Sequence, residues 1–235
     1  MDIENIPRHV ALIPDGNRRW AKEKGLKSWE GYFGVSLDNI EEISRVGADL
    51  GIPFVTFWGG SYKNLTERPS IEIKKLNEMY ALLAQRALDE PDLDKNEVRV
   101  RFMGEWKDLL QKKPIEKIEE LIEKTKNYSK NNLTYMIGYN GDREMLSAIN
   151  KIIEGTPGKP IDEDLLVENL WTKDLPPVDL VIRTGNDPHL STGFMMWHTK
   201  NALLHFDDKM WPDFTKEEFI RVINDFTQRE RRFGK

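Results

Sequence analysis

Residues 9–25 have the sequence HVALIPDGNRRWAKEKG. The apolar run from His9 to Pro14 predicts a buried strand, because a short, bounded apolar segment is typical of a sheet core. The next six residues are an acid, a glycine, an amide, two arginines and a tryptophan, namely Asp15, Gly16, Asn17, Arg18, Arg19 and Trp20. This abrupt change predicts either an ordinary surface turn or a strand that ends in a binding site for a charged ligand.

Strand-like and helix-like segments alternate along the chain. Strands are expected at 9–14, 54–60, 98–104, 133–140, 178–184 and 202–206, and helices at 34–51, 70–88, 114–129, 142–155, 162–171 and 215–232. Ser70 is expected to cap the second of these helices, and Pro114 to occupy the first position of the third. The alternation predicts an α/β fold with one mostly parallel six-stranded sheet and helices on both faces.

The whole chain, 1–235, is expected to be a single domain. It shows no internal repeat or low-complexity linker, and the loop at 154–164 is too short to divide two domains. A chain of 235 residues can bury a full core without disulfides.

The composition narrows the classes of protein to be considered. The chain has no cysteine and a formal net charge of −5. The missing cysteines exclude disulfides and thiolate metal sites and favour a reducing compartment, so a cytoplasmic location is expected. The mild acidity argues against nucleic acid as the main partner. The apolar runs are shorter than the roughly 18 residues of a membrane-spanning helix, so any membrane contact is expected to be peripheral.

Polar residues collect in four segments that follow predicted strands, at 15–20, 58–69, 138–144 and 183–193. Ligands of open α/β sheets bind outside the carboxyl ends of the strands, so we expect these segments to converge. Arginines with glycine-containing turns suit a phosphate, and Asp15 offers an oxygen ligand for Mg²⁺. A salt bridge at the strand end remains an equally good interpretation of Arg183.

Other phosphate and metal motifs are missing. The sequence has neither GxxxxGK[ST] nor a GxGxxG after a strand, and its four histidines lack metal-site spacing. Segment 206–213 is expected to be a loop rather than a metal site. The apolar stripe of the second helix, Met79, Leu82, Leu83, Ala87 and Leu88, predicts either core packing or the wall of an elongated apolar cleft.

Residues 9–25, 61–69, 178–198 and 211–234 together resemble, in order, the motifs of the cis-prenyltransferases, the undecaprenyl diphosphate synthase family. The resemblance implies an enzyme that elongates an allylic prenyl diphosphate with isopentenyl diphosphate and releases diphosphate. It also implies Mg²⁺, a dimer, and an apolar cleft between the second helix and the sheet for the prenyl chain.

The resemblance assigns expected roles to single residues. Asp15 would lie at the allylic diphosphate with Mg²⁺, and Asn64 at the reacting end. The allylic diphosphate would be held by Gly16, Asn17, Arg18, Arg19 and Arg68, and the isopentenyl diphosphate by Arg183, His189 and Ser191. Trp20, Tyr32 and Ser61 would complete the pocket. Arg232 and Gly234 would reach across the dimer to the partner's site.

Several positions depart from the family pattern, among them Lys63 in place of the usual acid of the second loop and Gly193 as a one-residue insertion. Tyr32 and His189 replace a histidine and an arginine, and Leu203 replaces the glutamate that helps to place Mg²⁺. Asp187 and Asp207 are the candidates to replace that glutamate.

Three hypotheses follow. The chain is an active prenyltransferase that uses isopentenyl diphosphate or another acceptor, including a coupling that is not head-to-tail. Alternatively, it is a subunit of a heteromeric prenyltransferase, or a protein that binds polyprenyl phosphates without catalysis.

Overall fold

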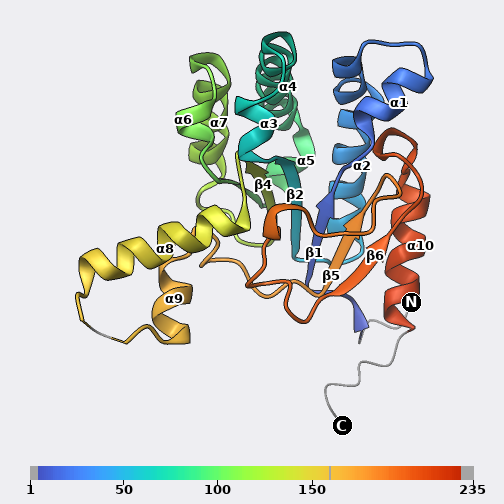
Figure 1. Ribbon diagram of the computed structural model, residues 1–235. Coiled ribbons are helices and arrows are strands. Elements are labelled where there is room, and N and C mark those ends of the chain that lie inside the picture. The colour runs from blue at the N-terminus through green and yellow to red at the C-terminus, as the bar shows by residue number, and fades with distance from the viewer. Residues whose placement is uncertain (1–4, 159, 229–235) are drawn as a thin grey trace.

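The computed structural model describes residues 5–158 and 160–228 (Figure 1). Its centre is a sheet of six strands, all parallel, in the order β3-β4-β2-β1-β5-β6. The strands are β1 His9–Ile13, β2 Phe54–Gly60, β3 Val98–Met103, β4 Asn131–Ile137, β5 Leu180–Arg183 and β6 Leu203–Phe206. The prediction of a six-stranded, mostly parallel sheet is therefore confirmed.

Strand β1 lies inside the sheet, and all five of its residues are buried. Val10 and Leu12 point to one face and Ala11 and Ile13 to the other, because successive side chains of a strand alternate. Both faces are covered by other parts of the chain, which explains why the strand is a continuous apolar run rather than an alternating one.

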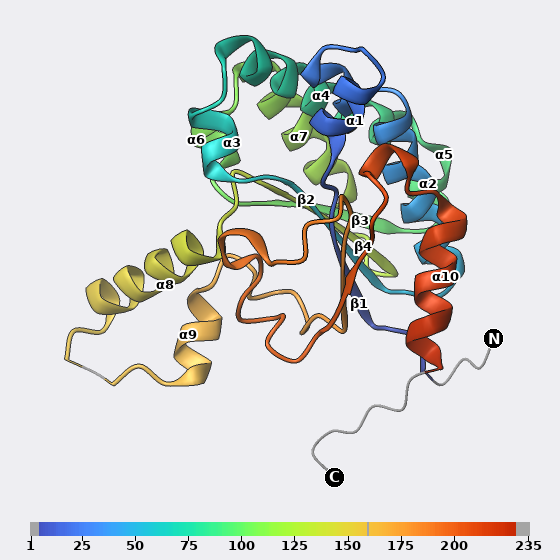
Figure 2. The same cartoon turned by 45° about the vertical axis from the view of Figure 1, so that its right-hand side comes forward.

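Four long helices pack over the face to which Val10 and Leu12 point (Figure 2). They are α2 Val35–Asp49, α4 Ser70–Asp89, α7 Lys112–Thr125 and α10 Lys216–Thr227. Helix α4 packs against α7, and α2 packs against α10. The main apolar core of the protein lies between these helices and the sheet.

The opposite face is covered differently. Phe194 and Met195, from the segment after β5, pack on Ala11 and Ile13. Helices α8 Gly141–Gly155 and α9 Glu163–Asn169 pack against each other and project to one side of the sheet (Figure 1). Helices thus lie on both sides, as expected, but irregular chain covers much of this second face.

Short helical segments were not predicted from the sequence. They are α1 Asn17–Glu23, η2 Ser28–Tyr32, α3 Tyr62–Thr66, α5 Pro91–Lys95, α6 Trp106–Leu109, η3 Ser191–Gly193 and η4 Trp211–Asp213. Segments of three to seven residues are too short to show a helical repeat of apolar side chains. Several of them belong to the loops at the carboxyl end of the sheet.

Helix α4 begins at residue 70, as predicted, but the expected capping role of Ser70 and the expected start of the third helix were wrong. Ser70 is the first residue of α4, Pro69 holds the cap position, and no side chain caps this end. Helix α7 begins at Lys112, so Pro114 is its third residue, and it ends at Thr125 rather than at residue 129. A proline in the first helical turn has no intrahelical acceptor for the N–H it lacks, so the first and the third position are both compatible.

None of the helices in the described ranges combines the length and the apolar character that a membrane crossing requires.

Candidate active site

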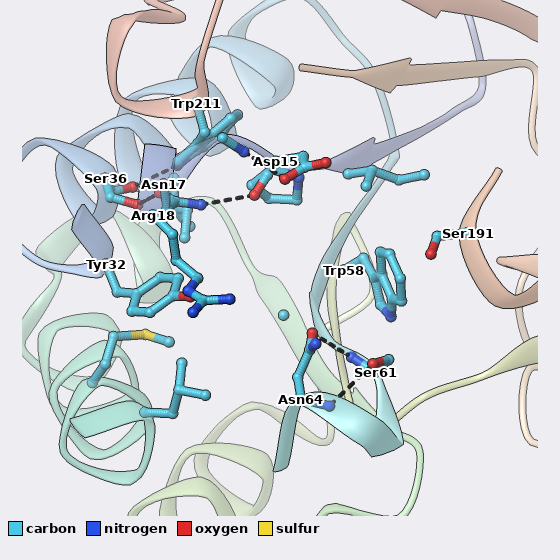
Figure 3. A pocket seen from close by; sticks show the side chains of 18 of the residues that line it. Asp15, Asn17, Arg18, Tyr32, Ser36, Trp58, Ser61, Asn64, Ser191 and Trp211 are labelled. Carbon is cyan, nitrogen blue, oxygen red and sulfur yellow. Dashed lines mark hydrogen bonds between the residues drawn. The ribbon is translucent and has the colours of Figure 1, made fainter. Parts of the chain in front are cut away.

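A cavity of about 350 Å³ lies at the carboxyl edge of the sheet (Figure 3). Its wall includes residues that follow β1, β2 and β5, such as Asp15, Asn64 and Ser191. The members of the predicted site that line it are Asp15, Gly16, Asn17, Arg18, Arg19, Tyr32, Ser61, Asn64, Arg68, Arg183 and Ser191. The parallel sheet thus brings together residues that are up to 176 positions apart in the sequence, as the interval from Asp15 to Ser191 shows.

The chain turns sharply after β1. The backbone N–H of Asp15 donates to the carbonyl of Ile13 at 2.9 Å and lies 3.0 Å from the hydroxyl of Thr184. Gly16 has a φ of 99°, and a Cβ at this position would lie 2.8 Å from the side chain of Met210. Both the backbone conformation and the available space therefore require glycine here.

Asn17 is buried and fixes this turn with its side chain. Its amide nitrogen donates to the carbonyl of Pro14 at 2.8 Å, and its oxygen accepts from the hydroxyl of Ser36 at 2.9 Å. The carbonyl of Asn17 leaves no room for a side chain at Gly31, where a Cβ would lie 2.1 Å away. Asn17 therefore connects the turn to the first turn of α2 and to the segment that precedes it.

Arg183, the last residue of β5, connects two carboxylates. Its side chain is only 5% exposed, and its Nη2 donates to Asp15 and to Asp187, at 2.8 Å each. Its Nη1 donates to the carbonyl of His189. Its buried Nε has no hydrogen-bond partner among the described residues, although buried donors of this kind are nearly always paired. Arg183 therefore forms the salt bridge that the sequence suggested, and it also lines the cavity.

Three more arginines surround the mouth of the cavity. Arg19 lies 3.5 Å from Asp15, and Arg18 donates to the buried carboxylate of Glu72 at 3.2 Å. Arg68 donates to the hydroxyl of Tyr32 and also lies over its ring. Burial raises the pKa of the Tyr32 phenol, so this side chain is a neutral hydroxyl that retains one proton to donate.

Ser61 and Asn64 form a reciprocal cap at the start of α3. The Ser61 hydroxyl accepts from the Asn64 backbone at 3.2 Å, and the Asn64 side-chain oxygen accepts from the Ser61 backbone at 3.1 Å. Figure 3 shows both side chains on the side of the cavity opposite Asp15. Because the cap holds the side-chain oxygen of Asn64, it also fixes the direction of the NH₂ group of this side chain.

The remaining predicted residues have other positions. The ring of His189 is 54% exposed and binds Asp187 at 2.8 Å, and it is outside the cavity lining given by the described residues. Trp20 is also outside that lining, and its indole N–H donates to Asp213 at 2.9 Å. Trp20 therefore fastens α1 to η4. Arg232 and Gly234 lie outside the described residues.

Asp15 forms a pair with Asp187, an acidic residue that is not in the cavity lining given by the described residues. Because Asp15 and Asp187 accept from the same nitrogen of Arg183, their carboxylates are close together. The carboxylate of Asp207 is buried and accepts from Arg221 and from the backbone of Lys209, so its oxygens have other partners. No group of three or more acidic or histidine ligands for a metal occurs within the described part of the chain.

Leu203 lies far from these carboxylates in its own chain. It pairs with Leu180 at the amino end of β6, and Leu180 pairs with Val10. Leu203 is thus level with Val10, the second residue of β1, and it packs partly against the core. The loss of a glutamate at position 203 does not remove a ligand from the neighbourhood of Asp15 within this chain.

The floor of the cavity is apolar. Leu37 and Ile40 of α2 and Leu76 and Met79 of α4 line it. The predicted stripe of α4 serves both purposes that the sequence left open, because Met79 lines the cavity and Leu83 is buried in the core. Leu82 is 40% exposed and does not belong to the buried stripe.

Some residues of the cavity were not singled out from the sequence. Ser36, Trp58 and Trp211 line it. Thr184 and Glu72 accept hydrogen bonds from Asp15 and Arg18, which also line it. Glu72 is 4% exposed and also accepts from Ser28 at 2.7 Å. For Glu72 the sequence offered one weak signal: an acidic residue stands at the third position of a helix that follows an arginine-containing loop.

Comparisons with known proteins agree with this arrangement. The sequence model of the family "Putative undecaprenyl diphosphate synthase" matches residues 13–234. A tritrans,polycis-undecaprenyl-diphosphate synthase (geranylgeranyl-diphosphate specific) of Methanocaldococcus jannaschii is 36% identical, with 100% of this chain and 85% of that protein aligned. An isoprenyl transferase of Thermotoga maritima is also 36% identical, with 97% of each chain aligned.

A solved structure has the same fold. The crystal structure of lavandulyl diphosphate synthase from Lavandula x intermedia, in complex with dimethylallyl diphosphate, superposes with a TM-score of 0.91. The two sequences are 26% identical, and the alignment covers 99% of this chain and 100% of the other. The chain therefore belongs to the undecaprenyl diphosphate synthase family and is a cis-prenyltransferase.

Proposed function

We propose that this chain joins the prenyl group of an allylic prenyl diphosphate to isopentenyl diphosphate and releases diphosphate. One observation carries the proposal: a mouth with Asp15, Arg68 and Arg183 opens directly onto an apolar floor of α2 and α4. The substrates of this reaction have the same two parts, a polyanionic diphosphate and an apolar chain.

In this proposal the allylic diphosphate lies between the turn after β1 and Arg68. Arg18, Arg19 and Arg68 would supply forked donors to its oxygens, which is the geometry that arginine offers to phosphate. Tyr32 would donate its phenolic proton, because its oxygen already accepts from Arg68. A neutral donor at this position would replace the histidine that most members of the family carry.

The carboxylate pair fits a magnesium ion. Mg²⁺ is usually held by one or two carboxylates together with substrate phosphates, and Asp15 and Asp187 are two such carboxylates in close proximity. Asp15 and Asp187 would hold the ion, and Asp187 would take the place of the glutamate expected at position 203. When bound, Mg²⁺ supplies positive charge that stabilises the leaving diphosphate.

The second substrate would bind beside Arg183 and Ser191, which also line the cavity. The Nε of Arg183 is a donor without a partner among the described residues. Asn64 would lie between the two substrates, because its side chain is held at the cavity by the cap with Ser61. His189 would act indirectly by orienting Asp187.

The chemistry follows from the arrangement. The allylic C–O bond breaks and its electron pair leaves with the diphosphate, while the double bond of isopentenyl diphosphate forms the new C–C bond and a proton is lost. Preorganised arginines stabilise the charge that develops on the leaving group. The apolar floor excludes water from the allylic cation.

We also propose a homodimer in the cytoplasm. Leu146 and Ile153 lie two turns apart on the projecting helix α8 and are 62% and 56% exposed, which is typical of a contact surface. Molar mass from light scattering tests this proposal: a single dimeric species is expected, and a monomer that becomes active only with a homologous chain supports the heteromeric alternative.

Product analysis tests the proposed reaction. The purified protein is incubated with Mg²⁺ and dimethylallyl, geranyl, farnesyl or geranylgeranyl diphosphate, with and without isopentenyl diphosphate, and the products are identified by mass spectrometry. Products longer by multiples of five carbons, formed only with isopentenyl diphosphate, are expected. Products from allylic diphosphates alone indicate a different coupling, and tight binding without any product indicates a binding protein.

A further inference from the structure

Three loops meet at the carboxyl edge of the sheet beside the active-site cavity, and one of them leads into the helix that carries Asn64. Asn64 belongs to α3, which follows β2, whereas Glu105 follows β3 and Arg143 lies in the first turn of α8, after β4. Glu105 and Arg143 are outside the cavity lining given by the described residues. Their contacts nevertheless lead to Tyr62, the first residue of α3.

The side chain of Arg143 joins the three loops. Its guanidinium carbon lies 3.9 Å from the centre of the Tyr62 ring, which is contact distance for a cation over an aromatic face. Its Nε and Nη2 both donate to the carboxylate of Glu105, the latter at 2.7 Å. Because two parallel hydrogen bonds fix the plane of a guanidinium, the ring of Tyr62 packs on a surface that Glu105 holds in place.

The start of α8 also holds α3. Asn140 occupies the N-cap position of α8, where a side-chain oxygen normally accepts from its own helix. Its oxygen instead accepts from the backbone N–H of Tyr62 at 2.9 Å, and Asn140 is buried. Next to it, the backbone N–H of Tyr139 donates to the carbonyl of Gly60 at 3.1 Å. The loop after β4 thus binds the segment that leads into α3 by its backbone.

These contacts reach Asn64 through the cap of α3. Ser61 and Asn64 cap this helix reciprocally, and both line the cavity. Helix α3 has only five residues, and a helix this short is not stable by itself. The position of Asn64 therefore depends on what holds the start of the helix. Asn140 holds Tyr62 by its backbone, and Arg143 holds it by its ring.

We propose that Arg143 is a positioning residue for Asn64: together with Glu105 it keeps α3, and so the NH₂ group of Asn64, in place against the substrates. The proposal rests on the proposed function, since it takes Asn64 to lie between the two substrates. Groups that are aligned before the reaction lower its barrier, so a displaced α3 slows the chemical step. Because Arg143 itself is outside the cavity lining given by the described residues, it should affect kcat more than either KM.

Three variants and a matched control test this role. Arg143→Gln and Tyr62→Leu each remove the contact between guanidinium and ring, whereas Tyr62→Phe keeps the ring. Arg45→Gln is the control, because Arg45 also pairs with a carboxylate, that of Glu90, and its side chain is 44% exposed, against 40% for Arg143. Circular dichroism and thermal unfolding check that each variant is folded.

The first measurement is steady-state turnover of farnesyl and isopentenyl diphosphates with Mg²⁺. Arg143→Gln and Tyr62→Leu should lower kcat by about tenfold and change each KM by no more than about twofold, which is less than a displacement of a whole ångström can cost. Tyr62→Phe and Arg45→Gln should keep the wild-type kcat. In an Asn64→Ala background, Arg143→Gln should have no further effect, because the group that it positions is gone.

Three kinetic results overturn the proposal. They are a wild-type kcat for Arg143→Gln, an equal loss for Arg45→Gln, and a full additional loss for Arg143→Gln in the Asn64→Ala background. The last of these would show that Arg143 acts on the reaction by a route other than Asn64.

Hydrogen exchange separates this proposal from the proposed reaction. Backbone exchange in peptides that cover 58–69 is followed by mass spectrometry without substrates. Arg143→Gln should speed exchange in these peptides by about threefold, the contribution of an exposed contact between a cation and a ring, and Arg45→Gln should not. Unchanged exchange for Arg143→Gln overturns the positioning role. A wild type without turnover contradicts only the proposed reaction, and the exchange rates then decide whether Arg143 holds α3.

Discussion

Asp15 and Asp187 accept hydrogen bonds from the same nitrogen of Arg183, each at 2.8 Å. Their Oδ2 atoms are therefore no farther apart than twice that distance, although the residues come from the ends of two different strands. The buried guanidinium of Arg183 balances these two negative charges. A divalent ion bound together with a substrate diphosphate would also balance them.

The carboxylate pair leads to the first prediction. Asp187→Asn should raise the Mg²⁺ concentration needed for half-maximal activity by about tenfold, the lower end of the loss when a group that supports a metal site is changed. Binding of Mn²⁺ in the presence of inorganic diphosphate, followed by electron paramagnetic resonance, should weaken in parallel. The exposed neighbour Asp208 provides the control, and Asp208→Asn should leave both curves unchanged. Equal metal curves for Asp187→Asn and the wild type would remove Asp187 from the site.

The second prediction concerns Asp15 itself. Asp15→Asn keeps the shape of the side chain but removes its charge, and it should lower turnover by about 10²-fold or more, as the loss of transition-state stabilisation commonly does. The rate of inorganic diphosphate release measures the effect. Asp213→Asn, which keeps an acceptor for Trp20, should have nearly the wild-type rate. Turnover of Asp15→Asn within a few-fold of wild type would exclude a catalytic role.

Tyr32 gives the third prediction. Tyr32→Phe removes the hydroxyl that binds Arg68, and it should raise the KM for the allylic diphosphate by about tenfold, because a hydrogen bond to a charged group contributes roughly 1.5–3 kcal/mol. The KM for isopentenyl diphosphate should change less. Tyr128→Phe, at a partly exposed position that is not in the cavity lining given by the described residues, is the matched control. A larger change for isopentenyl diphosphate would place Tyr32 at the other substrate.

Stability should depend on pH through His9, the fully buried first residue of β1. Its Nδ1 donates to the carbonyl of Pro176, and its Nε2 accepts from the Thr56 hydroxyl, so the ring is neutral. Burial lowers its pKa from 6.5 to about 4. The unfolded chain therefore binds the proton more readily, and the stability from this residue is full above pH 6.5 and is lost as the pH falls toward 4.

The size of this effect can be measured. A shift of this extent corresponds to roughly 3 kcal/mol of unfolding free energy lost across the window. Urea unfolding between pH 7 and 4 should show a smaller loss for His9→Asn than for the wild type. His189→Asn, at an exposed ring, should keep the wild-type loss. Glu144, whose carboxyl pKa is raised by burial, contributes with the opposite sign in all three proteins and cancels. Parallel pH profiles for His9→Asn and the wild type would contradict the assignment.

The order of strands and helices could be predicted from the sequence because it depends on local patterns. The run at β1 has five buried residues and could only be a strand with two covered faces. The sequence did not give the exact positions of Ser70 and Pro114 in their helices, because these positions depend on how each helix begins against its neighbours. The expected convergence of Asp15, Arg68 and Arg183 followed from one rule, that parallel strands present their carboxyl ends at one edge.

The sequence by itself determined the parallel sheet, the turn at Gly16 and many of the polar residues at the mouth of the cavity, because apolar runs, glycines and motif residues act over short distances along the chain. Only the tertiary structure decided that Arg183 connects Asp15 to Asp187 and that His189 lies outside the cavity lining given by the described residues. These relationships depend on side-chain directions and on the space between packed elements, which are fixed when distant segments pack together and leave no periodic signal in the sequence.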